Sequence, residues 1–237
     1  MSRLPFIFPN PATLIVGSFG DLDSIIQSTP ASLAEQCDLV EIRLDLYHKE
    51  IARTGPALWH HLLPFPILFT ARRHSEGSPY DLNLRDRMAL LKTALPDATM
   101  IDIEAISTSE MSGLISEIIS EKIPWIASYH DFQQLPSRQK LLTHAEIARE
   151  AGATAFKVAA RLQTMDDLTE LAHFQMSDPG IPLSTMGMGV LAPVSRLLCA
   201  QAGSVLNYGF IGEKSTAPGQ WSARQLRESI RSLNPYR

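Results

Sequence analysis

The residue with the clearest chemical potential in this sequence is Lys157, which lies in the apolar segment AFKVA at positions 155–159. That segment is typical of a short buried strand, where an ammonium group is costly to desolvate unless its charge is neutralised or used. A neutral lysine amine attacks carbonyl carbons, so the segment suggests a Schiff-base lysine. The five residues leave one alternative open, a lysine at a strand end that reaches solvent or pairs with a carboxylate.

Charged residues also alternate with apolar ones in the segment VEIRLDL at positions 40–46. Side chains on a strand point to opposite faces in turn, so Glu41, Arg43 and Asp45 share one face. In a barrel strand that face would be the interior. An exposed antiparallel strand with one wet face is the alternative.

Further polar residues fall within or near the ends of later apolar runs: Arg72, Glu76, Asp102, Glu104 and His130. In barrels of alternating strands and helices, the carboxyl ends of the strands hold the active site. His130 would be a proton carrier beside an imine lysine, although a lone histidine is more often structural. Asp102 and Glu104 fit a structural ion network as well as they fit catalysis.

The elements that must position these residues form a regular series. Short apolar runs alternate with helical sequence, which is typical of parallel βαβ units. Eight such runs within 237 residues favour one (β/α)8 TIM barrel over residues 1–237. The predicted strands span 14–19, 39–46, 67–72, 100–105, 124–132, 154–160, 182–188 and 204–210, and helices are predicted between them, with one at 21–37 and the last at 222–233. An open doubly wound sheet is the alternative, although no GxGxxG follows the first strand.

Composition excludes several classes of partner. Net charge is -4 and no basic run occurs, so neither nucleic acid nor a membrane surface is an expected partner. No apolar run approaches the roughly 20 residues of a membrane span. Cys37 and Cys199 lie in apolar helical sequence, which favours reduced thiols and a cytoplasmic location. No HxH, HExxH or CxxC spacing occurs, so no metal is expected.

Two features of the last third suggest anion binding and closure. Arg196 lies near the start of the helix after the seventh strand, where the helix end and the guanidinium both favour a carboxylate. The polar loop at positions 213–220 has the hydroxyls, amide and glycine of a lid, or it is a plain surface connector. Met186 is expected to pack on the lysine stem and on the substrate's carbon skeleton.

Six segments together carry a resemblance. They are EIRLDL at 41–46, FTARRHSEG at 69–77, SYHDF at 128–132, FKVA at 156–159, STMGMGVLAPVSR at 184–196 and STAPGQ at 215–220. With these segments, in this order, the chain resembles the type I 3-dehydroquinate dehydratases. Three positions depart from the family pattern: Ser78 follows Glu76-Gly77 in place of a glycine, Tyr208 stands where phenylalanine is common, and the closing loop is a residue longer, with Thr216 as its hydroxyl.

The resemblance implies a (β/α)8 barrel that converts 3-dehydroquinate to 3-dehydroshikimate and water without a cofactor, as a cytoplasmic homodimer. It places the imine on Lys157 and general acid–base catalysis on His130. It assigns the ring hydroxyls of the substrate to Glu41, Arg43 and Arg72, and the carboxylate end to Arg196 and Gln220, with Thr216 and Met186 as further contacts.

The histidine also needs a partner that orients its ring. Asp131 faces away from His130 in a regular strand, so Glu76 is the better candidate.

Two other functions stay open. A class I aldolase shares the barrel and the imine lysine but acts on a carbon–carbon bond, and a catalytically inactive barrel would only bind.

Overall fold

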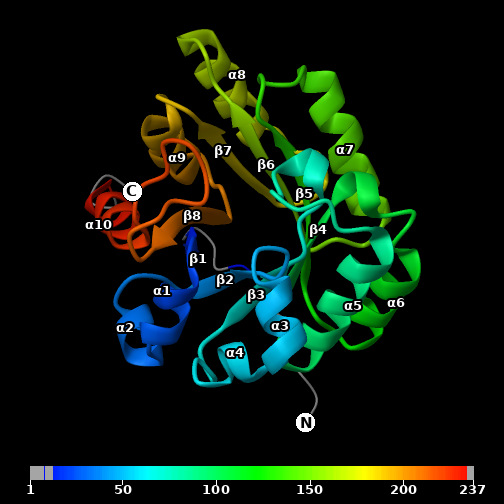
Figure 1. Cartoon of the computed structure of the whole chain (residues 1–237). Coiled ribbons are helices and arrows are strands. Elements are labelled where there is room, and N and C mark those ends of the chain that lie inside the picture. Colours follow the sequence, from blue (N-terminus) through cyan, green and yellow to red (C-terminus); the bar gives the residue numbers. More distant parts are fainter. Residues whose placement is uncertain (1–7, 9–12, 234–237) are drawn as a thin grey trace.

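A computed structural model describes residue 8 and residues 13–233, so positions 1–7, 9–12 and 234–237 of the predicted domain lie outside the described residues. Eight parallel strands form one sheet that curves into a nearly closed barrel (Figure 1). Their bounds are β1 Leu14–Phe19, β2 Leu39–Arg43, β3 Ile67–Thr70, β4 Met100–Glu104, β5 Trp125–Asp131, β6 Ala155–Arg161, β7 Leu183–Met188 and β8 Leu206–Ile211. This confirms the predicted (β/α)8 class.

Helices follow every strand and lie outside the barrel (Figure 1). The α-helices are α1 Leu22–Gln27, α2 Pro30–Ala34, α3 His48–Thr54, α4 Ala57–His60, α5 Leu84–Ala94, α6 Ser112–Ser120, α7 Arg138–Glu150, α8 Met165–Gln175, α9 Ala192–Gln201 and α10 Ala223–Leu233. Three short 3-10 turns, η1 His74–Glu76, η2 Leu95–Asp97 and η3 Ala105–Ser107, lie in the connections. In the described part of the chain, no helix is long and apolar enough to cross a membrane.

The single helix predicted at 21–37 is wrong, because the structure has α1 and α2 there. Asp21 caps the first, and its carboxylate accepts the backbone N–H of Ser24 at 2.8 Å. Thr29 caps the second, and Pro30 occupies its first position. Proline lacks an N–H donor and therefore begins a helix more readily than it continues one.

The strand predicted at 39–46 ends earlier, at Arg43. The chain then turns, and the backbone N–H of Leu46 donates to the carbonyl of Arg43 at 3.0 Å. Likewise, the strand predicted at 67–72 ends at Thr70. The polar residues predicted at the ends of these two strands therefore lie just after the strands, at the carboxyl end of the barrel.

The strand register aligns the inward-facing residues of neighbouring strands. Ser18 on β1 pairs with Glu41 on β2, and Lys157 on β6 pairs with Ser128 on β5 and with Ser184 on β7. The barrel interior also holds an apolar cluster, which begins near the amino ends of the strands and on β6, β7 and β8 reaches the pocket. Its buried members are Val16, Leu39, Leu68, Met100, Ile126, Ala155, Ala159, Met186, Met188, Leu206 and Tyr208. This cluster, called the apolar floor below, fills the barrel interior beneath the polar residues, as barrel interiors require.

The barrel is nearly closed between β7 and β8. These two strands are not joined by a regular ladder in the described structure. They are held by a bond from the Val205 N–H to the Leu183 carbonyl at 2.9 Å, and by Ser184 Oγ, which donates to the Leu206 carbonyl at 2.9 Å.

Candidate active site

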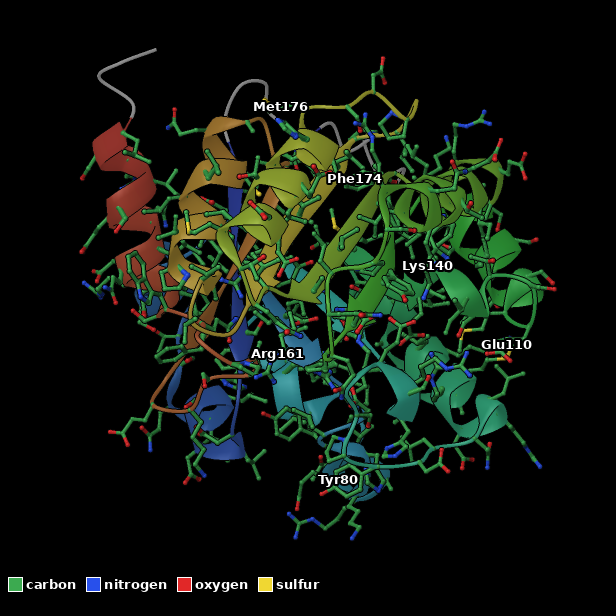
Figure 2. The ribbon with its side chains drawn as sticks, turned by 90° about the horizontal axis from the view of Figure 1, so that it is seen from above. Tyr80, Glu110, Lys140, Arg161, Phe174 and Met176 are labelled. Carbon is green, nitrogen blue, oxygen red and sulfur yellow. The ribbon has the colours of Figure 1, made fainter. Side chains whose placement is uncertain are left out.

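The predicted site residues meet in one pocket at the carboxyl ends of the strands. Arg161, the last residue of β6, marks that end, and in Figure 2 it lies on the same side of the molecule as Tyr80, opposite Met176. The pocket is lined by the ten residues predicted to catalyse the reaction or bind substrate: Glu41, Arg43, Arg72, Glu76, His130, Lys157, Met186, Arg196, Thr216 and Gln220. The polar residues of successive strands therefore share one location.

Lys157 lies in the middle of β6 and is only 4% exposed. Its Nζ donates to Asp102 Oδ2 at 3.0 Å and lies 4.2 Å from the centre of the Tyr208 ring. The alternative of a strand-end lysine that reaches solvent is wrong. Pairing with a carboxylate does occur, but inside the pocket, where the amine also faces the space that a substrate would enter.

Asp102 on β4 joins the lysine to an arginine. Its second oxygen, Oδ1, lies 2.9 Å from Arg72 and accepts a hydrogen bond from Ser128 Oγ at 2.6 Å. Burial alone would raise the pKa of this carboxyl, but the Arg72 and Lys157 cations outweigh it and hold the pKa at about 2. Asp102 is therefore a carboxylate, and it is the counter-ion of Lys157.

Glu104, two residues along β4, belongs to a buried ion network. It accepts from Arg72 Nη1 at 3.1 Å and from the backbone N–H of Arg73 at 2.9 Å, and it also pairs with Arg87 of α5. Arg87 in turn donates through Nε to the Ala71 carbonyl at 2.8 Å. Glu104 thus holds the Arg72 guanidinium in place through a buried ion pair. Of the two roles left open for Glu104, this favours the structural ion network over catalysis.

The charged face of β2 points into the barrel as predicted. Glu41 accepts hydrogen bonds from Ser18 Oγ at 2.7 Å and from Thr70 Oγ1 at 2.8 Å. Arg43 forms a two-bond ion pair with Asp45, at 2.8 and 2.7 Å. The alternative of an exposed antiparallel strand is wrong, because β2 is buried along its length and parallel to both neighbours.

His130 and Glu76 form a hydrogen-bonded pair. Glu76 Oε2 accepts the backbone N–H of His130 at 2.9 Å and lies 2.9 Å from its Nδ1. Burial raises the pKa of Glu76 to about 8. Burial and the Arg72, Lys157 and Arg43 cations lower the pKa of His130 well below its usual value. The imidazole is therefore neutral near pH 7.

Asp131 takes no part in this pair. Its Oδ1 accepts the backbone N–H groups of Gln133 and Gln134 at 2.9 and 3.1 Å, so it caps the turn after β5. The prediction that it faces away from His130 is confirmed. His144 of α7 is buried, and it stacks on Tyr129 at 4.4 Å between ring centres.

Arg196 lies in the second turn of α9 with its side chain in the pocket. It is 1% exposed, and its Nε and Nη1 have no hydrogen-bond partner among the described residues. Burial without a carboxylate lowers its pKa to about 10. A buried guanidinium of this kind is incomplete, and its planar fork matches a carboxylate.

The loop that follows β8 covers one side of the pocket. The backbone N–H and the Oγ1 of Thr216 both donate to Gln220 Oε1 at 2.9 Å, which fixes the amide. The loop docks on the β7–α9 connection through the Gly189 N–H, which donates to the Pro218 carbonyl at 3.1 Å. Since Thr216 and Gln220 line the pocket, the reading as a plain surface connector is not supported.

Sequence reasoning missed several features of this site. Asp102 was recognised as an inward-facing charge but not as the partner of Lys157, because that contact joins residues 55 positions apart. Ser18 also lines the pocket and was not singled out, although its even spacing from Leu14 and Val16 on β1 was the available signal. No group of three or more metal-ligating side chains occurs within the described residues.

Comparison with known proteins gives one consistent family. The family model of type I 3-dehydroquinase matches residues 15–236. A 3-dehydroquinate dehydratase of Shouchella clausii is 32% identical over 227 residues, which cover 90% of this chain and 88% of that protein.

Solved structures agree in fold. A 3-dehydroquinate dehydratase from Geobacillus kaustophilus superposes with a TM-score of 0.81 at 24% identity, covering 94% of this chain and 92% of that one. A type I enzyme from Clostridium difficile, solved with covalently modified comenic acid, gives 0.80 at 22% identity, covering 96% and 94%.

Proposed function

The chain belongs to the type I 3-dehydroquinase family and dehydrates 3-dehydroquinate in the shikimate pathway, and from this premise we propose which of its residues carry each step. The observation that carries the assignment is one pocket lined by a buried lysine, a neutral histidine and an arginine with two nitrogens that lack a partner among the described residues. The aldolase and inactive-barrel alternatives find no support in the family match.

Lys157 forms the covalent intermediate. Its amine attacks the substrate ketone carbon to give a carbinolamine, and loss of water from this gives an iminium ion. The attacking amine must first lose a proton, which ends on the carbinolamine oxygen and leaves with it as water, and Asp102, 3.0 Å from Nζ, is placed to hold the ammonium until then. The iminium nitrogen withdraws electrons and acidifies the neighbouring C–H bond.

His130 moves the proton. Glu76 Oε2 already accepts the backbone N–H of His130, so it acts as an acceptor toward Nδ1–H as well, and Nε2 carries the free lone pair. Nε2 takes the proton from the carbon beside the iminium, and the resulting enamine expels the hydroxyl one carbon further on. The imidazolium returns the same proton to that hydroxyl, which leaves as water. Hydrolysis of the product imine then frees Lys157.

The remaining residues hold the substrate. Arg196 supplies two unpartnered N–H donors for the carboxylate, with Gln220 and Thr216 beside it on the closing loop. Glu41, Arg43 and Arg72 present charged groups to the ring hydroxyls. Their side chains are held in place by hydrogen bonds, Glu41 by Thr70, Arg43 by Asp45 and Arg72 by Glu104. Met186 provides an apolar wall.

The direct test is an ultraviolet assay for the enone product with 3-dehydroquinate, followed by borohydride reduction and peptide mass mapping. We expect the adduct on Lys157, and we expect Lys157→Ala to fold normally yet show no turnover and no adduct. An unlabelled Lys157 under turnover conditions would rule out the imine proposal.

We also propose that residues 1–237 form one catalytic domain and that the enzyme is a cytoplasmic homodimer. Val194 and Leu198, one turn apart on α9, are exposed apolar side chains, as is Val190 before that helix. A second copy of the chain would cover them. Sedimentation analysis should give a dimer that Leu198→Lys weakens, and a wild-type monomer would contradict the proposal.

A further inference from the structure

Tyr208 is a pocket residue that the mechanism above does not use. It lies on the inner face of β8, is 4% exposed and lines the pocket. Its ring packs with the apolar floor of the barrel, and the Lys157 amine lies 4.2 Å from the ring centre. The ring thus supports the nucleophile from one side.

The hydroxyl of this ring is unusual in having no partner. Tyr208 Oη is buried and makes no hydrogen bond with any described residue. Buried tyrosine hydroxyls normally find a partner, and Tyr47 shows the usual case, since its hydroxyl donates to the Phe19 carbonyl at 3.1 Å. An unsatisfied buried donor destabilises the folded protein unless a ligand completes it.

The surroundings keep this hydroxyl protonated. Burial, together with the nearby carboxylates of Asp102 and Glu41, raises the pKa of Tyr208 well above its usual value. Both carboxylates already accept hydrogen bonds from other side chains. Ser18 and Thr70 donate to Glu41, and Ser128 donates to Asp102. The phenol is therefore a donor without an acceptor in the protein.

We propose that the Tyr208 hydroxyl donates a hydrogen bond to an oxygen of bound 3-dehydroquinate near the carbon that Lys157 attacks, and that Tyr208 is a specificity-determining residue. The ring stands beside the Lys157 amine and Tyr208 lines the pocket, so this side chain borders the space where the substrate ketone and its neighbouring oxygens must lie. This inference rests on the proposed active site, since it requires Lys157 to form the imine.

The test is Tyr208→Phe, which keeps the ring and removes only the oxygen. Loss of one neutral hydrogen bond to the substrate should raise KM roughly 3- to 10-fold with little change in kcat, because the contact is made in both the ground and transition states. The same change removes an unsatisfied donor from the free enzyme, so the Tm should rise by about 2–4 °C.

Tyr47→Phe is the matched control. It removes a buried hydroxyl that has a protein partner, so it should lower the Tm and leave KM unchanged. A Tyr208→Phe enzyme with wild-type KM, or with a lowered Tm, would overturn the proposal. Borohydride trapping of the wild-type enzyme separates this failure from failure of the active site, because only the latter leaves Lys157 unlabelled.

Discussion

At the scale of single residues, the site is built from charges whose partners fix their protonation. Asp102 lies between Lys157 and Arg72, and the two cations keep it ionised despite full burial. The acidic partner of His130 is Glu76, and burial raises the pKa of this carboxyl, so His130 has no neighbour as firmly ionised as Asp102 is for Lys157. His130, the residue proposed to transfer the proton, is therefore neutral and able to accept one, whereas Lys157, proposed to form the covalent bond, is held in an ion pair.

Removal of His130 should separate the two halves of the reaction. In His130→Ala, Lys157 can still condense with the ketone, but no group remains to take the proton, so we expect kcat to fall by about 10²- to 10⁴-fold. Borohydride should still trap an adduct on Lys157 in this variant. Normal turnover in His130→Ala would remove the residue from its proposed role.

Glu76 should govern the pH dependence of this step. Its raised pKa of about 8 means that it loses a proton as the pH passes that value. The carboxylate so formed strengthens His130 as a base through Nδ1–H, so kcat/KM should rise with pH near 8. In Glu76→Gln this limb should be absent and the rate lower. If the pH–rate profiles of variant and wild type coincide, Glu76 does not orient or tune the histidine.

At the scale of elements, the pocket depends on a loop whose position is set by backbone contacts. Gly219 adopts a φ of +73°, and a Cβ placed there would lie 2.1 Å from the Gly189 carbonyl oxygen. Only glycine allows the loop after β8 to approach the β7–α9 connection so closely. This approach brings Gln220 and Thr216 to the wall of the pocket that Lys157 also lines.

Gly219→Ala should therefore impair substrate binding more than folding. The clash displaces the loop, so KM should rise by roughly 10-fold or more through loss of the Gln220 and Thr216 contacts. Gly203→Ala is the matched control, because Gly203 has a φ of +92° but nothing within 4 Å of the added carbon. It should lower stability by about 1 kcal/mol and leave KM unchanged. Equal KM values in the two variants would show that loop placement does not matter.

At the scale of the whole molecule, an apolar floor and a ring of helices surround one layer of buried charges. Glu41, Arg43, Arg72, Asp102 and Glu104 come from three neighbouring strands and the segments that follow them, and all are at least nine-tenths buried. Buried charges persist only when they are paired, so this layer ties the strands together, and it includes three of the residues proposed to bind substrate. Stability and function are consequently linked to the same ionisations.

This linkage predicts a specific acid sensitivity. The pKa of Asp102 is about 2 in the folded protein against 3.8 for a free side chain, so its contribution is fully present above pH 3.8 and is lost as the pH falls toward 2. The lost part is about 2 kcal/mol. Urea unfolding of wild type and Asp102→Asn should differ most at neutral pH, and the difference should shrink below pH 3.8 and be smallest near pH 2. A constant difference across this range would mean that Asp102 is not the ionised group described.

The sequence by itself determined the barrel class and the strands that form it, and it predicted ten residues that the structure brings together in one pocket. Period-two alternation fixes which side of a strand faces inward, and parallel βαβ order brings all carboxyl ends to one mouth. Both are local or topological properties, which is why Lys157, His130 and Arg196 could be grouped before any contact was known. The boundaries were less certain, since turns at Arg43 and Thr70 and the break at Pro30 depend on capping and packing.

Only the tertiary structure decided how the charges are paired. Asp102 could have been structural or catalytic until its contact with Lys157 was seen, and Tyr208 was a departure from a family pattern until its hydroxyl proved to lack a partner. Such pairings join side chains from different strands, and their distances follow from barrel curvature and register. Protonation depends on those distances and on burial, so neither the counter-ion of the lysine nor the neutrality of His130 is encoded in any short stretch of sequence.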